Sequence, residues 1–196
     1  MQKTLTILVL SLLSGIAAAE SSTVPWALTV SLGHQSCKAE GGALCSENTN
    51  GMATELGLSY HLNRILSLGL DTSFGQFSGD DGYTTVTSLV STQARYEFQG
   101  WGLLAEIGYG YMSASREENE PSVGKVEYRY TTFQALRFGG GLFYALPNRF
   151  TIIARSNLTL GGKGELCATA NETESCRENQ DLIDLWSTSL GLSYGF

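Results

Sequence analysis

The sequence has few of the features of a helical protein. It contains three prolines, against 23 glycines, nine tyrosines and eight phenylalanines, and this composition favours strands. Its apolar stretch at residues 5–13 is well short of the roughly 20 residues that a helix needs to cross a bilayer. Beyond residue 23 no segment shows helical periodicity. These absences argue against a helical membrane protein and for an all-β chain.

The first residues form a separate segment. Lys3 precedes the apolar stretch 5–13, and the small residues 17–19 follow it, which is typical of a secretory signal peptide. No charged stop-transfer segment follows the apolar stretch, so a membrane anchor is disfavoured. We expect residues 1–19 to be a signal peptide and residues 20–196 to form one mature domain.

Basic residues are also scarce. The full chain has 12 Lys and Arg against 19 Asp and Glu, and loss of Lys3 with the signal leaves 11 against 19, a formal charge of −8. A strongly acidic chain does not suit nucleic acid, whose phosphates attract basic surfaces. We therefore expect no nucleic-acid partner.

The four cysteines fall into two close pairs, Cys37 with Cys45 and Cys167 with Cys176. A signal peptide sends the chain to an oxidising compartment, where such pairs form local disulfides. Seven and eight residues separate the paired cysteines, which does not match the tight spacing of structural zinc sites. We expect two disulfides and no metal.

Alternation of apolar with small or polar side chains recurs along the mature chain. Near its start, Trp26, Leu28 and Val30 share one face, while Thr29 and Ser31 share the other, as in a strand with one apolar face. The same pattern recurs in eight segments, near residues 26–33, 55–62, 66–74, 84–98, 103–111, 136–144, 150–159 and 182–196, and the sixth belongs to a long strand that follows the loop at 116–124.

The connections between these segments alternate in length. Short turns stand at residues 63–64, 99–100 and 147–149, whereas the other connections are long, including an acidic loop at 116–124 and the longest loop before the last strand. Outer-membrane barrels have short periplasmic turns and long external loops. The sequence predicts an all-β, eight-stranded antiparallel up-and-down transmembrane β-barrel in the bacterial outer membrane. A soluble β-sandwich is disfavoured because the apolar face lacks charge over its central positions.

The opposite face of the predicted strands carries charges. Lysine or arginine at the centre of the lipid face would cost about 2–4 kcal/mol, so these side chains must face the lumen. The lumen of an eight-stranded barrel is filled by its own side chains, and we expect the charges to pair there. The alternative is a narrow proton or ion path. The residues concerned are Glu55, Asp71, Arg95, Glu97, Glu106, Arg137 and Arg155.

The last segment, residues 190–196, alternates strictly and ends in Phe196. This ending resembles the small outer-membrane β-barrel family, which includes OmpA-type transmembrane domains and OmpX-like proteins. The resemblance implies that Phe196 is a signal for the barrel-assembly machinery, and that the partners include outer-membrane lipid and lipopolysaccharide. A monomer is expected, without a cofactor and with an unknown external ligand.

One short string could carry chemistry. His34 and Ser36, separated by Gln35, match the His-x-Ser pair that some outer-membrane lipid A deacylases use together with an acid. No acid stands out as a third member, and a triad is recognised by geometry rather than by a short string, so we favour coincidence. The other histidine, His61, is expected to be a hydrogen-bonding group in the lumen.

The expected loops are rich in acidic residues. Solvation explains them, and the alternative is binding of calcium or magnesium by hard oxygen ligands. These residues are Glu40, Glu47, Asp80, Asp81, Glu117, Glu118, Glu120, Glu165, Glu172, Glu174 and Glu178. The leading hypothesis is a non-enzymatic barrel with a structural or surface-binding role. The alternatives are a lipid A-modifying enzyme and a low-conductance channel.

Overall fold

The computed structural model describes residues 25–38, 49–77, 83–120, 124–170, 173–180 and 184–196. The expected signal peptide lies outside these residues. They form ten antiparallel strands and one short 3-10 turn, Pro147–Arg149. The strands are β1 (Trp26–Lys38), β2 (Thr49–His61), β3 (Leu66–Phe77), β4 (Tyr83–Phe98), β5 (Trp101–Glu120), β6 (Gly124–Ala145), β7 (Phe150–Leu160), β8 (Gly164–Ala170), β9 (Thr173–Gln180) and β10 (Asp184–Gly195). None of the described residues forms a helix long and apolar enough to cross a membrane.

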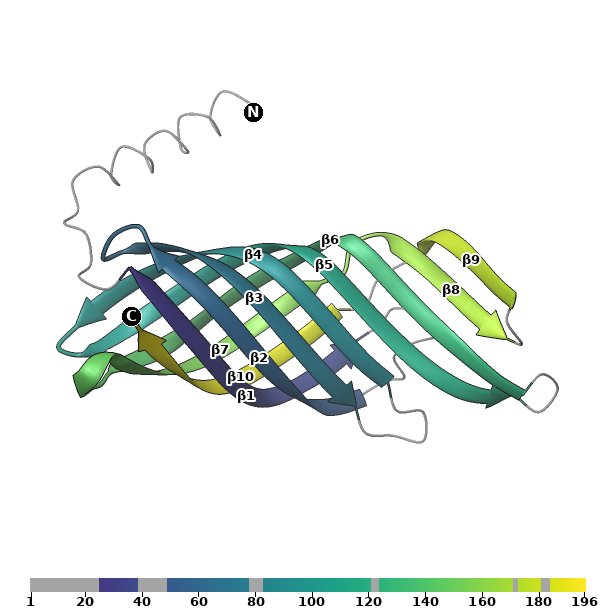
Figure 1. Ribbon diagram of the computed structural model, residues 1–196, viewed down its shortest axis with the longest axis horizontal. Coiled ribbons are helices and arrows are strands. Elements are labelled where there is room, and N and C mark those ends of the chain that lie inside the picture. Colours follow the sequence, from purple (N-terminus) through teal and green to yellow (C-terminus); the bar gives the residue numbers. More distant parts are fainter. Residues whose placement is uncertain (1–24, 39–48, 78–82, 121–123, 171–172, 181–183) are drawn as a thin grey trace, which may run out of the picture.

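Eight of the strands close into a ring, which confirms the predicted barrel (Figure 1). Strands β1 to β7 pair in chain order, and β10 pairs with both β7 and β1. A path that starts at Trp26 and follows the paired residues once around the ring returns to β1 at Ser36, ten residues further on. For eight strands this stagger requires a strand tilt of roughly 40°.

The two faces of the ring have opposite character, as the alternation predicts. In β3, Leu70 is 59% exposed and its neighbour Asp71 only 2%, because adjacent side chains point to opposite faces. Exposed apolar side chains cover the outside. Aromatic pairs mark both borders of this apolar surface. The pairs are Trp26–Tyr60, Trp101–Tyr144 and Phe150–Tyr194 near the short turns, and Tyr111–Phe133 at the opposite border.

The short turns all lie at one end of the barrel, called here the turn end, and the opposite end is the loop end. Between β2 and β3, the Asn63 side-chain oxygen accepts hydrogen bonds from the amides of Ile65 and Leu66, both at 2.8 Å. Between β4 and β5, Gln99 and Gly100 adopt positive φ angles of 51° and 83°, as two-residue hairpin turns require. Side-chain hydrogen bonds therefore stabilise the predicted turn after β2, and backbone conformation forms the predicted turn after β4.

The loop end differs from the sequence prediction. The expected loop at 116–124 is largely strand, because β5 runs to Glu120 and β6 begins at Gly124. The expected longest loop contains the hairpin β8–β9, which pairs with β6. One face of these strands is polar, and the opposite face mixes small, charged and apolar side chains such as Ala168, Arg177 and Leu166, so they lack the strong alternation that reveals a lipid-facing strand. Figure 1 shows β5, β6, β8 and β9 continuing past the ring.

Candidate functional site

A charged cluster fills the middle of the lumen. Arg137 on β6 places Nη1 2.6 Å from Glu55 Oε1 and 3.7 Å from Glu106 Oε1. The same guanidinium donates hydrogen bonds to the hydroxyls of Thr87 and Thr159. Arg137 therefore links strands on opposite sides of the ring.

A second arginine completes this cluster. Nη1 of Arg155 lies 3.6 Å from Glu106, 3.8 Å from Glu55 and 4.0 Å from Asp71. Ser91 donates a hydrogen bond to Asp71, and Gln93 donates one to Glu106. Side-chain exposure of the five charged residues does not exceed 8%. Burial of this kind requires mutual pairing of the charges.

The structure does not bring Arg95 and Glu97 into this cluster. Both lie near the turn end of β4, and Glu97 is exposed. The guanidinium of Arg95 instead lies 5.7 Å from the centre of the Phe143 ring. Alternation in the sequence indicates the face of a strand but not which charges share a level of the barrel.

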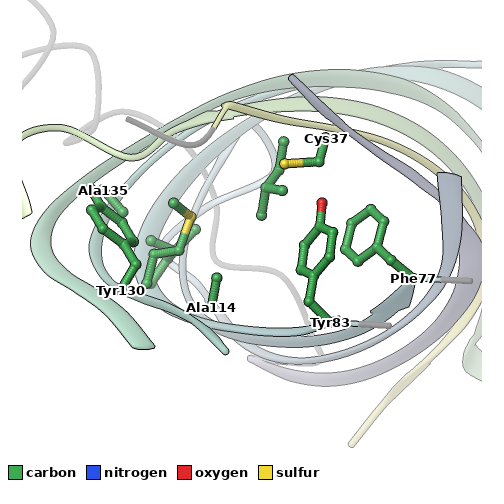
Figure 2. Packing of buried hydrophobic residues seen from close by; sticks show 9 residues of the cluster. Cys37, Phe77, Tyr83, Ala114, Tyr130 and Ala135 are labelled. Atoms are coloured by element: carbon green, nitrogen blue, oxygen red, sulfur yellow. The ribbon is translucent and has the colours of Figure 1, made fainter. Parts of the chain in front are cut away.

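Apolar layers lie on either side of the charged cluster. Towards the turn end, Leu104, Phe143 and Ile153 form a buried group. Towards the loop end, a larger group fills the barrel, in which Phe77 and Tyr83 stack at 4.2 Å (Figure 2). That group consists of Cys37, Phe77, Tyr83, Leu89, Met112, Ala114, Tyr130, Ala135 and Leu185. The charges are therefore closed off from both ends of the lumen. The sequence analysis did not predict these layers, because alternation places Phe143 on the inward face but does not show which inward residues share a level of the barrel.

His34 and Ser36 lie on the outer face of β1, near the loop end. His34 is exposed, and Ser36 is half-buried with its hydroxyl 3.5 Å from the carbonyl oxygen of Trp186. A catalytic triad needs an acid bonded to its histidine. The residues directly and diagonally opposite His34 are Asn50, Met52, Thr54, Trp186, Thr188 and Leu190. None is acidic, and Asp184 on the same face lies beyond Ser36, opposite Lys38. Within the part of the chain that the structure describes, none of these neighbours supplies a carboxylate to His34.

At the loop end, residues 113–120 of β5, residues 124–132 of β6, β8 and β9 form one sheet, called here the loop-end sheet. Its residues 113–116 also pair with β4 of the ring. A disulfide joins Cys167 on β8 to Cys176 on β9. The hydroxyl of Tyr130 donates to the carbonyls of Gly161 and Gly162, where the chain leaves the barrel. The sheet is therefore fixed both to the barrel and within its own hairpin.

The other cysteine pair is described only in part. Cys37 is disulfide-bonded and buried in the apolar layer at the loop end, while its expected partner Cys45 lies outside the described residues. Glu165 lies near the sulfurs of Cys167 and Cys176, but these sulfurs are bonded to each other and are not free thiolates of the kind that metals bind.

The loop-end sheet has two unlike faces. Val126 and Tyr130 are buried on one face. The other face is exposed and acidic, because pairing aligns Glu117 with Glu127 and Glu165 with Glu178. Its ion pairs are Glu117–Lys125 at 2.8 Å and Glu174–Arg129 at 2.9 Å. The acidic residues of this face are Glu117, Glu127, Glu165, Glu174 and Glu178, and its basic residues are Lys125 and Arg129.

Charge is distributed unevenly between the two ends. Beyond the ring, acidic residues dominate, whereas the turn end carries Arg64, Arg95 and Arg149 against Glu97. His61, at the end of β2, lines a cavity at the turn end. Several predicted loop acids lie outside the described residues, namely Glu40, Glu47, Asp80, Asp81 and Glu172.

Solved structures of outer-membrane proteins have a fold similar to that of this chain. Neisserial surface protein A matches with a TM-score of 0.60 and 14% identity, over 87% of this chain and 97% of that one. Ail, the attachment invasion locus protein of Yersinia pestis, matches with a TM-score of 0.57 and 14% identity, over 89% and 100%. The structure of Ail in complex with the heparin analogue sucrose octasulfate matches with a TM-score of 0.50 and 15% identity, over 88% of this chain and 99% of that one.

Sequence comparison gives the family. No curated protein matches the sequence of this chain. The family described as outer membrane protein beta-barrel domain matches residues 5–196. Because that match spans almost all of the sequence and eight of the described strands close the ring, the chain belongs to the outer-membrane β-barrel family and is a protein of the bacterial outer membrane.

Proposed function

We propose that this protein is a non-enzymatic surface-binding barrel whose contact surface is the exposed face of the loop-end sheet, and that it binds cationic segments of other macromolecules. The observation that carries this proposal is the direct pairing of Glu165 with Glu178. Like charges opposite each other in a sheet are destabilising. A cationic partner relieves this repulsion.

The exposed face is acidic, so its partner is expected to carry positive charge. After Lys125 and Arg129 pair with Glu117 and Glu174, the face still presents Glu127, Glu165 and Glu178. Ail has been solved with a sulfated, polyanionic heparin analogue. An acidic face repels such a ligand, so the preference of this chain is expected to be the opposite.

The lumen supports a binding role over transport. Arg137 and Arg155 are held by three carboxylates, with apolar layers on both sides. An ion crossing the barrel would have to break these buried pairs, and breaking one costs about 3–5 kcal/mol. The closed interior favours a function outside the ring.

The test uses the full mature protein in phosphatidylcholine nanodiscs. Two fluorescent 14-residue peptides are compared by anisotropy, one of alternating Lys and Thr and one of alternating Glu and Thr. We expect saturable binding of the lysine peptide that weakens with salt, and no binding of the glutamate peptide. Equal binding of both, or of neither, contradicts the proposal.

Glu178→Lys gives a sharper result, because it affects binding and folding in opposite directions. The substitution places a cation opposite Glu165, which stabilises the hairpin by about 0.2–1 kcal/mol, yet it lowers affinity for the lysine peptide by roughly three- to ten-fold. Glu97→Lys makes the same charge change at the turn end and is the matched control. Equal loss of affinity in both variants would show that net charge, not this face, governs binding.

A further inference from the structure

A cavity of about 630 Å³ opens at the turn end of the barrel. Its wall includes His61 at the end of β2, Asn63 and Arg64 in the following turn, and Arg95 on β4. Phe143 closes it towards the lumen, together with Leu104 and Ile153 behind it. Ligand pockets commonly have volumes of about 300–1,000 Å³, mostly apolar walls and a few polar groups. This cavity has a volume in that range, but its wall carries more polar side chains than is usual, and its apolar part is supplied by Ile65, Tyr96, Phe143 and Ala145.

Arg95 is unlike the two arginines of the charged cluster. Arg137 and Arg155 each have carboxylates within 4.0 Å. Among the described residues, Arg95 forms no ion pair, and its buried Nε has no hydrogen-bond partner. Its identified contact is with the ring of Phe143, 5.7 Å from the guanidinium carbon. Arg95 as a whole is partly buried, and a partly buried guanidinium without a carboxylate loses hydration that no ion pair replaces.

We propose that this cavity is a periplasmic binding site for a small organic monoanion, a carboxylate attached to an apolar group. Arg95 binds the carboxylate through its planar fork of donors, which matches carboxylate geometry. The apolar group lies against Phe143. The exposed Glu97 at the same cavity disfavours ligands with several negative charges.

The neighbouring groups agree with this assignment. Asn63 is buried and uses its side-chain oxygen for the turn, so its amide nitrogen keeps donors for a ligand. His61 adds a ring nitrogen on the same wall. The site lies at the opposite end from the loop-end sheet, so it is independent of the proposed surface-binding role.

The experiment titrates 4-fluorophenylacetate, an aromatic monocarboxylate, into the full mature protein in nanodiscs and follows the ligand by ¹⁹F NMR. We expect saturable broadening that is lost on competition with phenylacetate. Arg95→Met lowers affinity at least ten-fold, and Arg95→Lys, which keeps the charge but loses the fork, lowers it less. Arg149→Met removes an exposed arginine from the same end and serves as the matched control, with unchanged binding.

Three results would overturn the proposal. One is the absence of saturable broadening with the unaltered protein. Another is equal binding by the Arg95→Met and Arg149→Met variants. The third is competition by inorganic phosphate at the same concentration as phenylacetate, which would show a general anion site. If Arg95→Met does not fold, as judged by gel mobility before and after boiling, Phe143→Leu tests the apolar wall and is expected to weaken binding while Arg95 remains.

Discussion

At the scale of single residues, Arg137 makes more polar contacts in the lumen than its neighbours. Arg137→Met leaves Arg155 as the remaining cation for Glu55 and Glu106 in the cluster, and loss of one partner from a buried ionic group costs about 3–5 kcal/mol. Arg129→Met is the matched control, because Arg129 pairs with Glu174 in an exposed site and such pairs contribute less than about 1 kcal/mol. Urea unfolding in detergent micelles measures the free energy of unfolding of both variants. Equal losses would show that the cluster does not stabilise the barrel.

Ser36 provides a residue-scale test of enzymatic function. Because no acidic side chain lies directly or diagonally opposite His34, we expect Ser36→Ala and His34→Ala to leave the envelope chemistry unchanged. Mass spectrometry of lipid A is compared between cells that overexpress the unaltered chain, either variant, or none. Removal of an acyl chain by the unaltered protein but not by the variants would restore the deacylase hypothesis.

At the scale of elements, the disulfide Cys167–Cys176 holds the β8–β9 hairpin. Replacing both cysteines by serine removes a constraint of up to about 3 kcal/mol for a loop of this length. We expect trypsin to cleave after the exposed Arg177 roughly ten to a hundred times faster, while the barrel keeps its gel mobility before boiling. Unchanged cleavage would mean that β6 alone holds the hairpin.

Cys37 lies in β1, inside the barrel and not in the loop-end sheet. It is buried in the apolar layer with Phe77 and Leu185. The double variant Cys37→Ser and Cys45→Ser is therefore expected to weaken the loop end of the barrel as well as its first loop, yet to insert into the membrane. Failure to insert would show that this cysteine pair is needed for assembly.

The elements also show how far the sequence could predict the fold. Strands that face lipid alternate strongly, since Leu70 and Asp71 must lie in different media, and these strands were predicted in place. Strands in the loop-end sheet face water on one side, so Glu117, Glu165 and Glu174 were predicted as loop residues. The charged cluster was predicted as a set of lumen residues. Which charges share a level of the barrel depends on the stagger between strands, and the sequence of a single strand does not show it. Arg95 and Glu97 were predicted among the lumen charges and lie nearer the turn end than the cluster.

At the scale of the whole molecule, the lumen is expected to be closed. Charged and apolar layers alternate along it, so we expect no stepwise current from the reconstituted protein in planar bilayers. A 16-stranded porin in the same bilayers is the positive control, because barrels of that size enclose an aqueous channel. Discrete steps from this protein alone would support the channel hypothesis.

Assembly of the whole barrel is tested at Phe196. Its amide donates to the Trp26 carbonyl at 2.9 Å, so its backbone helps to close the ring, while its side chain is 52% exposed on the outside. Phe196→Ala keeps the backbone bond. We expect it to change the stability of the refolded protein by less than about 1 kcal/mol but to lower the amount of assembled barrel in cells. Wild-type amounts in the outer membrane would refute the assembly-signal hypothesis.

The length of the β5–β6 hairpin determines how far the protein projects from the cell. Past the Tyr111–Phe133 pair, β5 continues to Glu120. At about 3.3 Å per residue and a tilt of roughly 40°, this segment rises roughly 20 Å from the border of the apolar surface. A protein on another cell or on an adjoining surface therefore meets the acidic sheet before it meets lipid, and contact does not require it to penetrate the layer of lipid head groups.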